Sequence, residues 1–167
     1  MICLIGRPLS GKTTVSERLA KARNWNAFHP GVLVRLLKPD QEFINKWGWS
    51  QKWNDVIIAA ADAMPWNTVL DGYPRNETQW RIDAPIYCLD MPSGVLYRRA
   101  ENRRREDDKR EIIYKRIRAF DDFLADLQQY KHVRRFTNAD ELYVAALGEM
   151  DAQIAGQVDR VDPELPT

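Results

Sequence analysis

The feature that most constrains this chain lies at its N-terminus, where a short apolar run leads into a glycine-rich loop. Residues 1–5 are all apolar, and residues 6–14 read GRPLSGKTT, which matches the pattern G-x-x-x-x-G-K-[S/T] at every fixed position. Val15, Leu19 and Ala22 follow at helical spacing. A strand, such a loop and a helix can together wrap a phosphate group, because the loop amides and the helix N-terminus point toward the anion. We therefore expect a nucleotide-phosphate site here.

The loop residues can be given roles from the chemistry of phosphate binding. Gly6 and Gly11 can adopt backbone angles that are closed to other residues. Lys12 would place a positive charge beside the outer phosphates, and a threonine hydroxyl (Thr13 or Thr14) would face a magnesium ion. The loop residues that we expect to contact ATP are Leu9, Ser10, Gly11, Lys12, Thr13 and Thr14.

Length and composition indicate one compact domain. The chain has 167 residues and a net charge of +1, so its overall charge does not favour nucleic acid or a membrane as partner. No apolar run approaches the roughly 20 residues that span a bilayer. Cys3 and Cys88 lie in apolar, strand-like runs and are expected to be buried free thiols in a reducing compartment. We expect a monomeric, cytoplasmic protein with a single domain over residues 1–157 and a frayed tail over residues 158–167.

Strands and helices are predicted to alternate along the chain. After the first strand and helix, further strands are predicted at residues 26–29, 68–70, 85–89 and 133–136, with helical spacing between them. This alternation indicates an α/β fold of three layers, the P-loop NTPase fold, in which a central parallel five-stranded sheet carries helices on both faces. Ligands of such folds bind at the carboxyl ends of the strands. Asp71 directly follows a predicted strand and is expected at that edge.

A second informative motif is DGYPR at residues 71–75. A phosphate-binding loop followed by D-G-[F/Y]-P-R at the end of a later strand resembles the adenylate kinase family of nucleoside monophosphate kinases. Four further spacings resemble that family, and the likeness covers residues 1–140. They are Gly31 with Arg35, Arg75 with Gln79, Arg99 with Arg103 one helical turn later, and R-x-D-D from Arg105 with Arg116 eleven residues on.

The resemblance implies a set of residues for the acceptor nucleotide. Gly31, Arg35, Gly72 and Arg75 would hold its phosphate, and Gln79 would read its adenine, since an amide can pair with both an exocyclic amine and a ring nitrogen. The alternative for Gln79 is an ordinary exposed helical glutamine. The acceptor-binding helical insert would span about residues 30–66, and a minimal lid about residues 103–108.

The resemblance also implies a cage of cations around the transferred phosphate, completed by Lys12 and Arg75. Guanidinium suits this task because it stays charged and grips phosphate oxygens with two donors. The caging arginines after the fourth strand would be Arg99 and Arg103, which also contact ATP, and Arg105 and Arg116, which also contact the acceptor. Asp71 would act on magnesium, directly or through water, and Asn138 would touch the donor adenine through its backbone.

Some positions depart from the family pattern. Leu9 and Thr13 stand where adenylate kinases usually have glycine, and Pro30 stands where they usually have a threonine that contacts the acceptor base. In these positions the loop is closer to P-loop kinases of other small molecules. The short lid predicts measurable ATP hydrolysis without an acceptor. His29 and His132 show no partner in the sequence and are assigned no role.

The sequence thus predicts a magnesium-dependent kinase that moves the γ-phosphoryl group of ATP reversibly to a nucleoside monophosphate, AMP or dAMP in the first place. Two other interpretations stay open. One is a P-loop kinase for another small acceptor, such as a sugar acid, a shikimate-like alcohol or a modified nucleotide, with Asp71 recruited as the base. The other is a non-catalytic nucleotide-binding module, which would not require the arginine cage.

Overall fold

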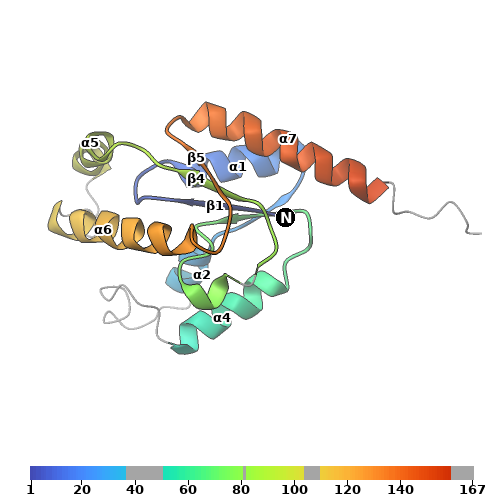
Figure 1. Ribbon diagram of the computed structural model, residues 1–167, viewed down its shortest axis with the longest axis horizontal. Coiled ribbons are helices and arrows are strands. Elements are labelled where there is room, and N and C mark those ends of the chain that lie inside the picture. Colours follow the sequence, from blue (N-terminus) through green and yellow to red (C-terminus); the bar gives the residue numbers. More distant parts are fainter. Residues whose placement is uncertain (37–50, 81, 104–109, 159–167) are drawn as a thin grey trace, which may run out of the picture.

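A computed structural model describes residues 1–36, 51–80, 82–103 and 110–158 of the chain (Figure 1). Its sheet has five strands in the order β2-β3-β1-β4-β5, and every neighbouring pair is parallel. The strands are β1 (Ile2–Gly6), β2 (Asn26–Phe28), β3 (Thr68–Asp71), β4 (Ile86–Leu89) and β5 (Val133–Phe136). Each lies within one residue of its predicted position, and the last one has the predicted bounds.

Six helices and one short 3₁₀ turn connect and cover these strands within the described residues. The helices are α1 (Lys12–Arg23), α2 (Pro30–Leu36), α4 (Gln51–Asp62), α5 (Ser93–Arg103), α6 (Arg110–Leu127) and α7 (Ala139–Val158), and the 3₁₀ turn is η1 (Glu77–Gln79). Of the predicted helical insert, residues 37–50 lie outside the described residues, as do the tail after Val158 and the predicted lid after Arg103. None of the helices in the described ranges has the length and apolarity needed to cross a lipid bilayer.

The alternation of side chains along β1 sets up the three layers. Ile2 and Leu4 pack with α1 and α7 in one apolar cluster, whereas Cys3 and Ile5 pack with α2, α4 and α6 in another. Successive residues of a strand point to opposite faces, so a strand that is apolar throughout must be covered on both sides. Figure 1 shows α1 and α7 above the sheet and the other group of helices below it. The predicted three-layer P-loop fold is confirmed.

A third, smaller apolar cluster joins α5 to α6. It contains Leu96 and Ala100 from α5 and Ile113 and Ile117 from α6, and Leu9 of the glycine-rich loop packs against it. In Figure 1 these two helices lie at the left, the side toward which β1 runs from the N-terminus. The cluster therefore connects the phosphate-binding loop to the helices that flank the predicted lid.

Candidate active site

The glycine-rich loop between β1 and α1 has the tight geometry that its sequence predicts. A Cβ atom on Gly6 would lie 2.6 Å from the carbonyl oxygen of Leu89, so only glycine fits between β1 and β4 there. Gly11 precedes α1 with a φ of 99°, in the left-handed region that glycine adopts most easily. The amide of Ser10 donates to the carbonyl oxygen of Arg7 at 3.2 Å, which closes the turn. The loop amides and the N-terminus of α1 are thus held together at the carboxyl end of β1.

Leu9 shows why this loop tolerates a residue other than glycine. Its φ is 64°, a left-handed conformation that is uncommon for a leucine. Its side chain packs against the apolar cluster between α5 and α6, and burial of apolar surface there offsets the conformational cost. Leu9 was predicted to contact ATP, and with its side chain in this cluster its route to a phosphate is through its backbone.

Arg7 is a residue of this loop whose importance the sequence does not reveal. Its Nε and Nη2 atoms donate to the two carboxylate oxygens of Asp121 on α6 at 2.8 and 3.0 Å, and its Nη1 donates to the carbonyl oxygen of Met91 at 3.1 Å. The same Nη1 lies 3.1 Å from Asp90. The hydrogen bond to Asp121 raises the pKa of Arg7. Arg7 therefore anchors the loop to α6 and to the segment after β4.

Asp71 lies beside the loop at the end of β3 and is 6% exposed. The hydroxyl of Thr13 donates to its Oδ2 atom at 2.6 Å, so Thr13, rather than Thr14, is the threonine that the structure brings to this carboxylate. No described residue forms a hydrogen bond with its Oδ1 atom. Burial alone would raise the pKa of Asp71, but the hydrogen bond from His29, the charge of Lys12 and the hydrogen bond from Thr13 together hold that pKa below its usual value.

His29 is the second residue that contacts Asp71, and here the sequence interpretation was wrong. Its Nδ1 atom lies 2.9 Å from Asp71 Oδ2, although no partner for His29 was predicted. The contact follows from the sheet, because β2 pairs with β3 in parallel so that Phe28 lies opposite Leu70. The next residue along each strand is then His29 and Asp71. A prediction of the strand register would have found this pair.

Lys12 occupies an unusual electrostatic environment. Burial lowers its pKa to about 8, against the effect of Asp71, which raises it, while the positive charges of Arg75 and Arg116 lower it further. Lys12 is the first residue of α1, whose N-terminus also disfavours a positive charge. The site therefore gathers positive charge around the loop, an arrangement that an anion would stabilise.

Arg75 is held against the turn that follows β3. Its Nε atom donates to the carbonyl oxygen of Gly72 at 2.6 Å. Gly72 has a φ of 74°, a backbone angle that favours glycine, and a Cβ atom there would lie 2.8 Å from Arg75 Nη2, so the guanidinium group would have to shift. The amide of Gly72 donates to the carbonyl oxygen of Leu4 at 2.7 Å. The turn thus continues the hydrogen bonding of the sheet and places the guanidinium group at its edge.

The other predicted arginines are only partly described. Arg99 on α5 donates from Nη1 to the loop carbonyl oxygens of Leu9 and Ser10 at 2.9 and 2.6 Å, so it lies directly over the loop. The positive charge of Arg116 on α6 helps to lower the pKa of Lys12. For Arg35 in α2 and Arg103 in α5 the structure describes the backbone alone, and Arg105 lies outside the described residues.

Gln79 is buried and forms hydrogen bonds with other residues of the protein. It is fully buried, at 0% exposure, so the interpretation as an exposed helical glutamine is wrong. Its Oε1 atom accepts from the backbone amide of Arg75 at 2.8 Å, and its Nε2 atom donates to Asn54 Oδ1 at 2.8 Å. An adenine could reach this amide only if the residues that cover it moved.

Two more predicted positions lie near the ends of helices. Asn138 caps α7, because its Oδ1 atom accepts from the amides of Asp140 and Glu141 at 2.8 and 3.3 Å. Its side chain is thus used within the protein, in agreement with the expectation that any contact to a nucleotide is through the backbone. Gly31 lies in the first turn of α2, which begins with Pro30 at the position where proline is favoured.

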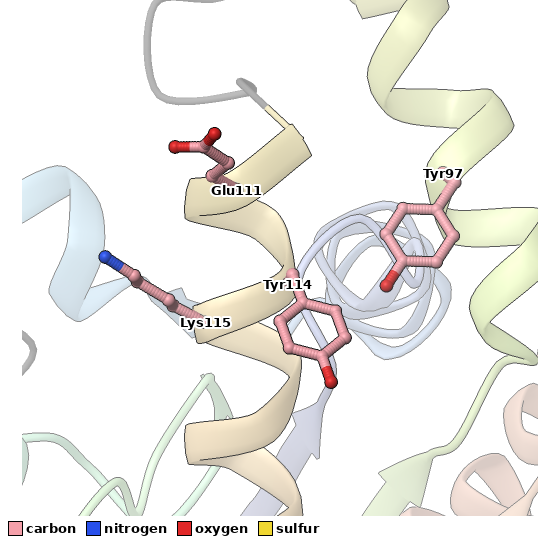
Figure 2. A pocket seen from close by; sticks show the side chains of 4 residues that line it. All are labelled: Tyr97, Glu111, Tyr114 and Lys115. Carbon is pink, nitrogen blue, oxygen red and sulfur yellow. The ribbon is translucent and has the colours of Figure 1, made fainter.

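A pocket of about 460 Å³ opens between α5 and α6 (Figure 2). Its lining residues are Tyr97, Glu111, Tyr114 and Lys115. Figure 2 shows Tyr97 of α5 and Tyr114 of α6 on the same side of α6, with Glu111 and Lys115 directed away from them. None of the four was predicted to contact a nucleotide.

Comparisons with known proteins agree with this geometry. No protein-family model matches the chain. An adenylate kinase of Prochlorococcus marinus strain MIT 9515 is 27% identical over 83% of this chain and 90% of its own length. A second adenylate kinase, from Prochlorococcus marinus subsp. pastoris strain CCMP1986, is 26% identical over 77% of this chain and 82% of its own. The predicted resemblance to the adenylate kinase family is confirmed by these relatives.

Among solved structures, shikimate kinase from Bacteroides thetaiotaomicron has the same fold. It superposes with a TM-score of 0.61 over 92% of this chain and 97% of its own, at 17% sequence identity. At that identity the match establishes the fold alone. Together the relatives and the fold identify a P-loop kinase, an ATP-dependent phosphotransferase.

Proposed function

We propose that this adenylate kinase-like chain transfers the γ-phosphoryl group of ATP, reversibly, to a nucleoside monophosphate, with AMP and dAMP as the first candidates. The observation that carries the proposal is the gathering of cations from four parts of the chain around one loop. They are Lys12 at the start of α1, Arg75 after β3, Arg99 on α5 and Arg116 on α6. A module that only binds a nucleotide through its loop would not require the last three.

On the donor side, the loop amides and Lys12 would hold the β- and γ-phosphates of ATP. Arg99 already reaches the loop carbonyl oxygens of Leu9 and Ser10 and could turn its remaining donors toward a phosphate. Because the pKa of Lys12 is lowered to about 8, an arriving phosphate would restore its full charge. The donor phosphates would thus be held by groups that are positioned before ATP binds.

The residues fit a magnesium ion that enters with ATP. Thr13 and Asp71 would hold it, directly or through water. The Thr13 hydroxyl lies against Asp71 beside the loop, and no described residue forms a hydrogen bond with the Asp71 Oδ1 atom. Such an ion neutralises charge on the phosphates during transfer. His29 would keep the carboxylate oriented through its contact with Oδ2. Magnesium in kinase sites needs few protein ligands because phosphates and waters supply the rest.

On the acceptor side, Arg75 would hold the monophosphate, together with Arg35 and Arg105, and Arg116 would face the bridge between the two nucleotides. Gly31 and Gly72 would allow the backbone to approach closely. Transfer then depends on alignment and on neutralising the migrating group. No general base is required, because a phosphate oxygen is already an anionic nucleophile.

An alcohol acceptor is the second candidate, because the fold is shared with a shikimate kinase. An alcohol must lose a proton, so a carboxylate base would be needed near the acceptor. Asp71 is poorly suited to that task, since its pKa is held below the usual value and its Oδ2 atom is bonded to Thr13 and His29. This environment favours a phosphate acceptor over an alcohol.

The experiment is ADP production from Mg-ATP by the purified protein, with AMP, CMP, UMP, GMP, their deoxy counterparts, thymidine monophosphate and shikimate offered in turn. Turnover that depends on one of the monophosphates is the expected result, with AMP or dAMP best. Turnover with shikimate alone, or ATP binding without turnover on any acceptor, would overturn the proposal. We further propose that the enzyme is a monomer in the cytoplasm. Light scattering of the same sample tests whether it is a monomer.

A further inference from the structure

A network of polar side chains, of which Asn54 and Gln79 are buried, connects α4 to the DGYPR turn. Asn54 of α4 donates from Nδ2 to the hydroxyl of Thr78, whose own proton goes to Asn76 Oδ1 at 2.7 Å. Asn76 Nδ2 in turn donates to Asn54 Oδ1 at 3.0 Å, which closes a ring of three side chains. The Nε2 atom of Gln79 donates to the same Asn54 oxygen at 2.8 Å. Every link pairs one donor with one acceptor.

Gln79 connects this ring to Arg75. The backbone amide of Arg75 donates to Gln79 Oε1 at 2.8 Å. Because a backbone N–H can only donate, this contact fixes which end of the Gln79 amide is oxygen, and the direction of every other hydrogen bond in the network follows from it. The orientation of Gln79 is therefore determined by the backbone of the residue proposed to hold the acceptor phosphate.

Burial makes this arrangement hard to leave. Gln79 is 0% exposed and Asn54 is 3% exposed. Breaking the hydrogen bonds of a buried amide without replacing them costs far more free energy than exchanging them for hydrogen bonds to water. Moving Gln79 toward a base would strip the amide of Arg75 of its acceptor, in the segment where the guanidinium group must be held still.

We propose that Gln79 and Asn54 are positioning residues that fix Arg75 for the phosphate of any acceptor, and that Gln79 does not read the base. The inference rests on the proposed function, since it concerns the acceptor side of that site. It predicts that α4 transmits its position to Arg75 through Asn54. The choice among acceptor bases is then made by residues other than Gln79.

Asn54 provides the sharpest test, because it contacts the side chain of Gln79 and is itself only 3% exposed. Gln79→Ala and Asn54→Ala should each lower kcat/KM for the acceptor about tenfold, the effect of losing one buried hydrogen-bonded partner. The loss should be the same for AMP, CMP, UMP and GMP, and the KM for ATP should stay within twofold of the wild type. If Gln79 reads adenine instead, Gln79→Ala will lose activity with AMP alone and Asn54→Ala will keep it.

A binding measurement separates the two outcomes without turnover. Ribose 5-phosphate carries the phosphate of AMP but no base, so its affinity reports on the residues that hold the phosphate and not on any reading of the base. We expect Gln79→Ala to weaken ribose 5-phosphate and AMP by the same factor in calorimetric titrations. If Gln79→Ala weakened the binding of AMP but left the affinity for ribose 5-phosphate unchanged, the proposal would be overturned. Because no catalysis is needed, a protein that failed to turn over any monophosphate would contradict the proposed function and still answer this question.

Two further variants control for folding. Thr78→Ala removes a hydroxyl from the ring at an exposed position, so it should fold and show a smaller loss that is again equal for all acceptors. Gln129→Ala changes an exposed glutamine and should leave every constant unchanged. An effect of Thr78→Ala that is confined to AMP would count against the proposal in the same way as the result for Gln79→Ala.

Discussion

The proposed donor and acceptor sides of the site differ in how far their geometry depends on side chains from other parts of the chain. On the donor side, the glycine-rich loop is defined by a short sequence pattern: Gly6 leaves room for the backbone of β4, Gly11 takes a left-handed φ, and Lys12 follows directly. On the acceptor side, Arg75 depends on Gly72 beneath it and on Gln79, which depends in turn on Asn54 from another helix. A motif defined by backbone geometry can be read from sequence, whereas a motif that depends on side-chain partners needs the fold.

Removing Lys12 should give the largest effect and should fall on the donor side. Lys12→Ala is expected to lower turnover on the order of a thousandfold, because a fixed charge at the transferred phosphate is lost. Affinity for ATP should fall as well, while binding of ribose 5-phosphate should survive. Turnover within tenfold of the wild type in a folded Lys12→Ala protein would contradict the assignment of this loop.

Removing Arg75 should show the opposite pattern. Arg75→Ala is expected to lower acceptor-dependent turnover about a hundredfold and leave ATP affinity unchanged, and Arg75→Lys should not restore activity because it lacks the two-donor grip. Arg118→Ala, an exposed arginine on α6, is the matched control. Equal losses of ATP and acceptor affinity in Arg75→Ala would remove the distinction between the two sides.

His29 lies between the two sides and should affect magnesium. His29→Ala removes the group that orients Asp71, so the magnesium concentration for half-maximal activity and for Mg-ADP binding should rise roughly tenfold. His29→Asn, whose amide can replace the Nδ1 contact, should restore most of the affinity for magnesium. A normal magnesium requirement in His29→Ala, with kcat alone reduced, would show that the histidine acts by another route.

Gly72 should matter for stability before it matters for activity. Gly72→Ala places a Cβ atom in a left-handed backbone conformation and 2.8 Å from Arg75 Nη2. We expect the free energy of unfolding to fall by about 1–3 kcal/mol in urea denaturation. Gly94→Ala is the control, because a Cβ atom at Gly94 meets no atom within 4 Å. Similar stabilities of the two variants would mean that the turn after β3 is not constrained.

The smallest effect concerns the pH dependence of stability. In the folded protein without nucleotide the pKa of Lys12 is about 8, below its ordinary value of 10.5. Between these values the unfolded chain binds a proton that the folded chain does not, so the contribution of Lys12 to stability rises as the pH rises from 8 toward 10.5. Lys12→Met should lack this slope, so the unfolding free energy of the wild type minus that of the variant should rise between pH 8 and 10.5. Phosphate binding should be accompanied by proton uptake above pH 8, measurable by calorimetry in buffers of different ionisation enthalpy.

Most of the fold could be predicted because its signals are local and repeated. The five strands were found from short apolar stretches, and the alternation with helices led to the parallel sheet. The contacts of some side chains could not be predicted, each for a physical reason. His29 required the register of β2 against β3, Gln79 has an amide that can bond inside or outside the protein with equal ease, and Leu9 occupies a position that the loop pattern leaves open.

The central claim is reversible phosphoryl transfer between two nucleotides, and the most direct test runs the reaction backward. The purified protein would be given magnesium and ADP, alone and mixed in turn with CDP, UDP or GDP, and followed by ³¹P NMR. We predict that ATP and a monophosphate appear in equal amounts, and that ADP alone suffices if AMP is an acceptor. A sample in which ADP binds but no ATP forms in any mixture would contradict the account.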